Sequence, residues 1–196
     1  MQRFLFAIDH ISIWAGKLFA WAAVLLTGVV CYEVFMRYAI GAPSGWAYDM
    51  GYILYGALFM MAGAYALATH SHVRADVLYR LLPVRVQGGI DVLLYLVFFL
   101  PAVAALMYAG YHFAEMSWRI GERSPYSPIG PPLYHFKALI PISGFFLALQ
   151  GIAELIRSAI ALRTGKWPPR VHDVRDIGDE LIESTLSEQA NKETVR

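Results

Sequence analysis

The sequence predicts an all-α membrane protein with four transmembrane helices and a short interfacial amphipathic helix between spans 2 and 3. Of the 196 residues, 58% are hydrophobic and only 16% are charged, whereas soluble domains carry about 25% charged residues. The mean hydropathy is positive, at +0.47. A soluble fold of this length could not bury so much apolar surface, so the bilayer is the expected surroundings of most of the chain.

Four apolar runs are long enough to span a membrane, because a hydrocarbon core of about 30 Å needs about 20 helical residues. They cover residues 18–36, 47–69, 92–118 and 138–161, and an extension of the first run upstream to residue 11 is left open. None of them shows the alternation of a membrane β-strand. Pro101 is expected to kink the third helix. We therefore expect a transmembrane domain over residues 1–162, followed by a polar cytoplasmic tail over residues 163–196.

The basic residues predict the orientation. An even number of spans places both termini on one side, and most basic residues flanking the spans fall on that side. The opposite side carries Arg37, Arg119, Arg123 and Lys137. Because basic residues favour the cytoplasmic side, we expect a multi-pass protein of a bacterial inner membrane with both termini in the cytoplasm.

The acidic residues are expected near the helix ends. Glu33 precedes Arg37 by four residues and Glu115 precedes Arg119 by four, which is a favourable helical pairing. Glu154 precedes Arg157 by three residues. We interpret the three pairs as interfacial contacts that set helix depth, and the absence of an expected acid at mid-span argues against a transport pathway within this chain.

Small residues recur along three of the spans. Such stripes let helices approach closely in lipid, and the sequence leaves open whether they pack within this chain or against another membrane protein. The stripes are Gly56 with Gly63, Ala57 with Ala64, Ala102 with Ala105 and Ala109, and Gly144 with Ala148 and Gly151.

Two connections have distinctive compositions. Residues 70–89 place apolar side chains on one helical face with arginines between them, which predicts the interfacial helix ending at Pro83. The two histidines there, His70 and His72, are too few to predict a metal site. The loop between spans 3 and 4 contains four prolines and is expected to be stiff. It is either a docking surface or a plain connector.

An ordered set of motifs over residues 15–160 resembles the small membrane subunit, the DctQ-like or Q-type subunit, of tripartite ATP-independent periplasmic (TRAP) transporters. An Arg-aromatic pair, Arg37 and Tyr38, ends the first span, and Trp46 followed by Asp49 opens the second. Asp49 stands where the family usually has Glu, and we expect Arg37 to pair with Glu33 or with Asp49 and so to hold the first two helices together. Gly56 and Ala57 follow, and then a His-Val-x-x-Asp segment comprising His72, Val73, Arg74 and Asp76.

The resemblance implies a scaffold subunit of a secondary transporter and no enzyme. It would brace a large multi-span permease of the elevator type, which holds the substrate and sodium sites. It would also help to dock a periplasmic substrate-binding protein, for sodium-coupled uptake of an organic acid. The candidate interface residues are Glu33, Arg37, Trp46, Asp49, His72, Arg74, Asp76, Arg119 and Arg123.

The alternative is a haem b or quinone-binding four-helix anchor subunit of a respiratory enzyme. Such a subunit needs paired histidines inside its spans, and within the predicted spans we find only His112, near an end. We therefore expect no cofactor in this chain. The net charge of +1 gives no reason to expect a nucleic-acid partner, so the expected partners are the permease, the binding protein and membrane lipids.

Overall fold

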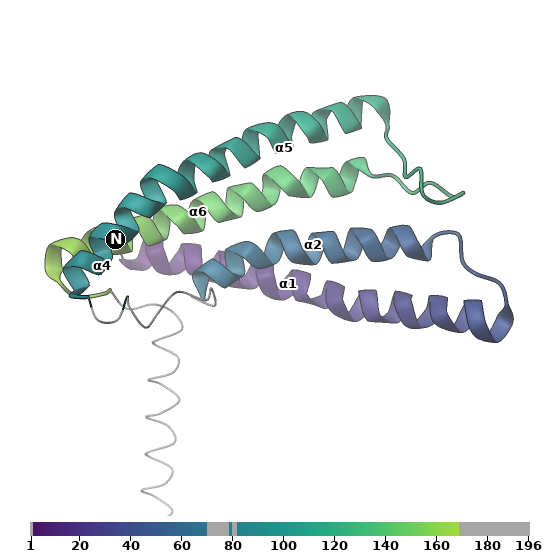
Figure 1. The fold of residues 1–196 in the computed structure, drawn as a ribbon, viewed down its shortest axis with the longest axis horizontal. Coiled ribbons are helices and arrows are strands. Elements are labelled where there is room, and N and C mark those ends of the chain that lie inside the picture. Colours follow the sequence, from purple (N-terminus) through teal and green to yellow (C-terminus); the bar gives the residue numbers. More distant parts are fainter. Residues whose placement is uncertain (1, 70–78, 80–81, 169–196) are drawn as a thin grey trace, which may run out of the picture.

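A computed structural model describes residues 2–69, 79 and 82–168 (Figure 1). Within these residues, four helical segments are long and apolar enough to cross a membrane. They comprise Gln2–Ile40, Ala47–Ala68, Val84–Ile120 and Tyr134–Thr164. The predicted all-α architecture with four membrane-spanning helices is confirmed.

Two of the four segments contain a π-helical turn. Helix α1 (Gln2–Phe35) continues into the π turn η1 (Met36–Ile40), and α2 is Ala47–Ala68. Helix α4 (Val84–Leu94) continues through the π turn η2 (Tyr95–Phe99) into α5 (Leu100–Ile120). Helix α6 is Tyr134–Thr164.

The helix of the second span matches the predicted limits, and the helices that contain the first and third predicted spans begin earlier than those spans. Helix α1 begins at Gln2 rather than at residue 18 or 11, because its first turns bury Leu5 and Ile8 against α6. The third segment begins at Val84, directly after Pro83. Residues 84–89 thus belong to that long helix and not to a connection. The predicted interfacial helix falls mostly on residues 70–78 and 80–81, which lie outside the described residues.

The π turn η2 lies directly before Pro101, where the sequence predicts a kink. A proline inside an α-helix has no N–H to donate, and its ring clashes with the carbonyl group four residues earlier. For Pro101 that carbonyl belongs to Val97, which lies within the π turn Tyr95–Phe99. The wider turn changes the backbone around Val97, so the proline sits at the start of a new helical segment.

The helices pack as a row in the order α1, α2, α6, α5, with α4 also against α6. The N-terminal part of α1 also contacts α6. Figure 1 shows the N-terminus beside the C-terminal part of α6. We call the end of the row that holds the turn 41–46 and the loop 121–133 the hairpin end. We call the opposite end, with the N-terminus and the end of α6, the terminal end.

Small residues let the central helices approach closely. Ala57 and Ala64 are buried. An added Cβ would lie 2.4 Å from the ring of Phe136 at Gly56 and 2.7 Å from the Met107 side chain at Gly144. The stripes on α2 and α6 therefore serve packing within this chain. The stripe of Ala102, Ala105 and Ala109 on α5 is instead exposed.

Glycine also terminates α5. Gly121 has a φ of 59°, which favours glycine because other side chains are strained there. Its N–H donates to the Trp118 carbonyl at 3.3 Å, and the Glu122 N–H donates to the Ser117 carbonyl at 3.0 Å. This is the Schellman pattern, and it turns the chain from α5 into the loop 121–133.

The close approach of α4 to α6 at Gly88 predicts the first mutational outcome. An added Cβ at Gly88 of α4 would lie 2.7 Å from the Leu162 N and 2.8 Å from the Ser158 O of α6, both backbone atoms. Gly88→Ala should therefore lower the unfolding free energy in detergent micelles by about 1–3 kcal/mol. The control is Gly28→Ala, because Gly28 has nothing within 4 Å of an added Cβ and alanine favours helix by about 1 kcal/mol. A Gly88→Ala variant as stable as the wild type would contradict this packing.

Candidate functional site

Polar and charged side chains gather in two layers, one at each end of the helix row. Along α1, Asp9 and Glu33 are about 36 Å apart at 1.5 Å per residue. Asp91 and Glu115 bracket the third segment at a similar spacing. A hydrocarbon core is about 30 Å thick, so each layer lies near one membrane boundary. Lys17 lies between the layers on α1 and is exposed, and its long stem can reach back toward the headgroups.

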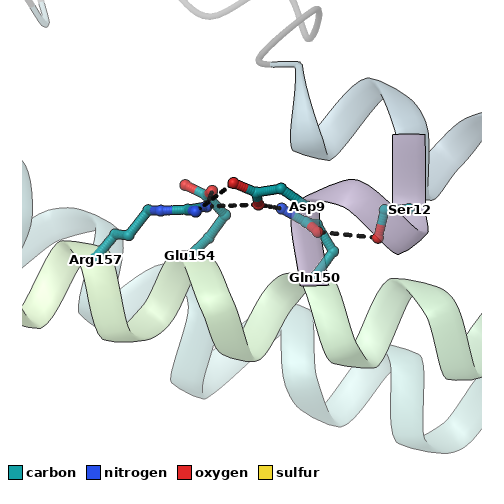
Figure 2. A network of polar contacts seen from close by, with 5 residues as sticks. All are labelled: Asp9, Ser12, Gln150, Glu154 and Arg157. Atoms are coloured by element: carbon teal, nitrogen blue, oxygen red, sulfur yellow. Dashed lines mark hydrogen bonds and ion pairs between the residues drawn. The ribbon is translucent and has the colours of Figure 1, made fainter. Parts of the chain in front are cut away.

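The layer at the terminal end contains a buried ionic cluster of Asp9, Ser12, Gln150, Glu154 and Arg157 (Figure 2). Arg157 donates from Nη2 to Asp9 Oδ2 at 2.5 Å and from Nη1 to Asp9 Oδ1 at 3.0 Å. Its Nη1 also donates to Glu154 Oε1 at 2.6 Å. One guanidinium thus binds a carboxylate from α1 in a two-pronged geometry and a second carboxylate from its own helix.

Two uncharged side chains extend the cluster along α1 and α6, away from the terminal end. Gln150 Nε2 donates to Asp9 Oδ1 at 2.9 Å, and Ser12 Oγ donates to Gln150 Oε1 at 3.0 Å. The side chains of all five residues are at most 1% exposed. Figure 2 shows the network bridging the gap between α1 and α6. The cluster therefore fixes both the register and the separation of these two helices.

Burial makes this cluster sensitive to the loss of one member. Charges taken out of water require close partners, and removing one partner of a buried pair costs about 3–5 kcal/mol. The sequence predicts that Glu154 and Arg157 form an interfacial pair near a helix end. They do pair, but both are buried, because Asp9 from the unexpectedly long α1 covers them.

At the hairpin end, Glu33 closes the turn between α1 and α2. Arg37 donates to Glu33 Oε1 from Nη2 at 2.6 Å and from Nε at 3.2 Å. The other oxygen, Oε2, accepts the Ser44 N–H at 3.0 Å and the Ser44 hydroxyl. Trp46, in the same turn, stacks on Tyr32 with ring centroids 5.6 Å apart. The expected contact of Arg37 with Glu33 is confirmed.

Asp49 does not pair with Arg37, so that alternative is wrong. Its side chain is 1% exposed, and its Oδ1 accepts the Ser124 hydroxyl at 2.5 Å. Asp49 lies in the first turn of α2, where a carboxylate is favoured by the helix dipole. The neighbouring Tyr48 also makes an edge contact with Tyr126. Asp49 therefore ties α2 to the loop 121–133 rather than to α1.

Backbone hydrogen bonds give the loop 121–133 a defined shape. Arg123 and Pro132 form an antiparallel bridge, and the Ser124 N–H donates to the Pro131 carbonyl at 3.0 Å. At the base of the loop, Lys137 Nζ donates to Glu122 Oε2 at 2.5 Å. The Lys137 hydrogen bond holds the pKa of Glu122 below its usual value of 4.5.

The remaining candidates are not brought into one site. Arg119 pairs with Glu115 of its own helix at 2.5 Å, and its side chain is 74% exposed. Arg123 is exposed at the base of the loop. His72, Arg74 and Asp76 lie outside the described residues, so their predicted interface role remains untested.

Sequence reasoning missed Asp9, Ser12 and Gln150 altogether. A helical spacing signal was available, because Asp9 and Ser12 are three apart while Gln150, Glu154 and Arg157 follow at four and three. Each set falls on one face of a helix. The signal could be used only if the helix was assumed to begin well upstream of its apolar run.

Histidines occur in the spanning helices at more positions than the predicted spans suggest. His10 lies in α1 and His135 in α6, in addition to His112 in α5. His112 contacts Tyr108 and His135 contacts Trp118. Within the described part of the chain, no group of three or more His, Cys, Asp and Glu residues could hold a metal ion.

The ionic cluster predicts a large effect of one substitution. Arg157→Gln leaves the Asp9 and Glu154 carboxylates buried without their cation and should lower the unfolding free energy by about 3–5 kcal/mol. Arg119→Gln is the matched control, since it also removes an arginine from a helical pair but at an exposed position. It should cost less than about 0.5 kcal/mol. Denaturant titration in micelles measures both values, and equal losses would show that burial of the cluster contributes nothing.

The Glu122–Lys137 pair predicts a dependence of stability on pH. Because the pKa of Glu122 is lowered in the folded chain, the pair stabilises the fold above pH 4.5, the usual value. This contribution is lost as the pH falls below that value through the pKa of the folded state. Glu122→Gln should remove this part of the acid-induced loss. Unfolding curves of wild type and variant on both sides of pH 4.5 measure the difference, and parallel curves would contradict it.

The comparison with known protein families accounts for most of the chain. The family model of the DctQ component of tripartite ATP-independent periplasmic transporters matches residues 26–161. This range includes α2, α4, α5, most of α6 and the C-terminal part of α1. A search of curated proteins finds no match. The family match confirms the resemblance carried by the motifs at the ends of the spans. This multi-pass membrane protein belongs to the DctQ family, the small membrane component of TRAP transporters.

Proposed function

We propose that the chain is the static brace of a TRAP transporter, bound to a large elevator-type permease and helping to dock a periplasmic substrate-binding protein. The observation that carries the proposal is that polar contacts join the pair α1 and α2 to the pair α5 and α6 at both ends of the row. Asp9 and Arg157 join α1 to α6 at the terminal end, and Asp49 and Ser124 join α2 to the loop after α5 at the hairpin end. A row of helices held at both ends suits a scaffold that stays fixed while a partner moves.

The proposed orientation places the terminal end in the cytoplasm and the hairpin end in the periplasm of a bacterial inner membrane. Support comes from the basic residues near the terminal end, which are favoured on the cytoplasmic side. Those among the described residues are Arg3, Arg85, Arg157, Arg163 and Lys166, and the long side chain of Lys17 can reach toward the same end.

The loop 121–133 is the proposed contact with the binding protein. Tyr126 is 72% exposed and Ile129 58% exposed, while hydrogen bonds hold the base of the loop. Exposed aromatic and aliphatic side chains on a preformed loop provide contact area at a low cost in conformational entropy. The same loop is hydrogen-bonded to α2 through Ser124, so a protein bound to the loop would be coupled to the helix row.

The proposed transport chemistry lies in the partner. The sodium and organic-acid sites would belong to the permease, and this chain would contribute no ion or substrate ligand. In this chain the buried acids Asp9 and Asp49 are bonded to Arg157 and Ser124, which supports a structural use of these carboxylates.

The docking proposal is tested with Tyr126→Ala combined with Ile129→Ala. In cells that express the chain with its permease and binding protein, the variant should assemble normally but take up solute more slowly. The affinity of the purified membrane complex for the binding protein should fall about tenfold, the loss expected for hot-spot side chains. Surface plasmon resonance against the immobilised complex measures that affinity.

The matched control is Tyr111→Ala, because Tyr111 is 60% exposed on α5 and lies outside the loop. It should leave the affinity unchanged. Equal affinity of the loop variant and the wild type would refute docking at this loop. Solute uptake by vesicles that contain only this chain would refute the proposal that the chain is a static brace.

A further inference from the structure

A groove of about 660 Å³ runs between the halves of α1 and α2 that are nearest the hairpin end. Charged and hydroxyl groups line the part of the groove nearest the hairpin end, and aliphatic and aromatic side chains line the rest. Its lining includes Leu26, Val30, Arg37, Tyr48, Tyr52 and Tyr55. Its apolar part faces the position of the hydrocarbon core, and its polar part lies in the charged layer at the hairpin end.

The length of the groove matches one leaflet. Arg37 and Leu26 are about 16 Å apart along the helix at 1.5 Å per residue. Half of a hydrocarbon core measures about 15 Å. The groove therefore extends from the headgroup level to about the middle of the membrane.

Arg37 has donors left for a ligand at the polar part. Its Nε and Nη2 bond to Glu33 Oε1, and within the described residues its Nη1 makes no hydrogen bond that the structure records. The Arg37 side chain is 56% exposed. Glu33, by contrast, uses both oxygens on Arg37 and Ser44, so the site offers more to an anion than to a cation.

We propose that this groove binds one phospholipid of the leaflet at the hairpin end, with its phosphate on Arg37 and one acyl chain along Val30 and Tyr55. Guanidinium groups bind phosphate oxygens through charge-assisted hydrogen bonds. Because phosphate is common to phospholipids, the site should accept different headgroups. The proposal rests on the groove alone and does not depend on the proposed transport role.

A helix of a partner protein fits the groove less well. A helix with its side chains is about 10 Å wide, and close helix contacts in lipid favour small residues. The walls here carry the rings of Tyr48, Tyr52 and Tyr55 instead, each more than half exposed. A row of large rings along the groove suits a flexible chain better than a second helix.

The test is native mass spectrometry of the purified full chain in detergent with added dioleoyl phosphatidylglycerol or dioleoyl phosphatidylethanolamine. The wild type should retain one molecule of either phospholipid. Arg37→Gln should weaken retention about tenfold through loss of the charged donor, and Val30→Trp should do so by filling the groove. The matched controls are Arg119→Gln and Val24→Trp, because both residues are exposed and neither lines the groove.

Folding of each variant is checked by circular dichroism and thermal unfolding. If Val30→Trp unfolds, Gly51→Leu replaces it, since an added Cβ at Gly51 meets Leu26 Cδ1 at an ordinary 3.7 Å. Equal weakening by Arg37→Gln and Arg119→Gln would overturn the proposal, because binding would then follow general charge. Unchanged retention in the groove-filling variant would overturn it as well. The same holds if that variant displaces a co-expressed permease while still retaining phospholipid, since the groove would then hold a protein helix.

Discussion

The buried guanidinium of Arg157 is the interaction on which the arrangement of the helices depends. It draws the first three turns of α1 onto α6 through Asp9, although these helices are otherwise separated by α2 in the row. The apolar contacts beside it join Leu5 and Ile8 to Ala153, Leu149 and Ile156. Without the ionic contact the N-terminal part of α1 would have little to hold it against the row, because the lipid competes on equal terms for apolar side chains.

The hairpin end is held differently. Its contacts are Glu33 with Ser44 and Asp49 with Ser124, which are carboxylates accepting from a backbone amide and from hydroxyl groups. Only Asp49 of the two is fully buried. Between the two layers, close approach of small residues such as Ala57 and Ala64 takes over. Polar contacts thus hold the helices together near the membrane boundaries, and close packing of small residues holds them together between those boundaries. This is expected where water no longer drives apolar association.

The sequence sufficed for the spans and for contacts within one helix. Twenty apolar residues define a span through the thickness of the bilayer, and the Glu33–Arg37 and Glu115–Arg119 pairs follow from a spacing of four. It did not suffice for the start of α1. That start is set by packing onto α6 and not by the hydropathy of residues 2–17.

Contacts between distant segments could not be predicted for a related reason. The Asp49–Ser124 contact joins residues 75 positions apart, and the Asp9–Arg157 contact joins residues 148 positions apart. Nothing in local spacing says which acid meets which donor. With Asp49 assigned to Arg37 as one alternative, the tie to the loop was missed, and with it the reason why that loop is firmly held.

The 148 positions between Asp9 and Arg157 also have a consequence in time. At a synthesis rate of about 5–20 residues per second, Asp9 is added to the chain roughly 7–30 seconds before Arg157. For that interval the newborn α1–α2 hairpin carries a carboxylate that must stay hydrated at the bilayer surface. The N-terminal turns of α1 therefore pack onto α6 late, after the last span has been synthesised and inserted.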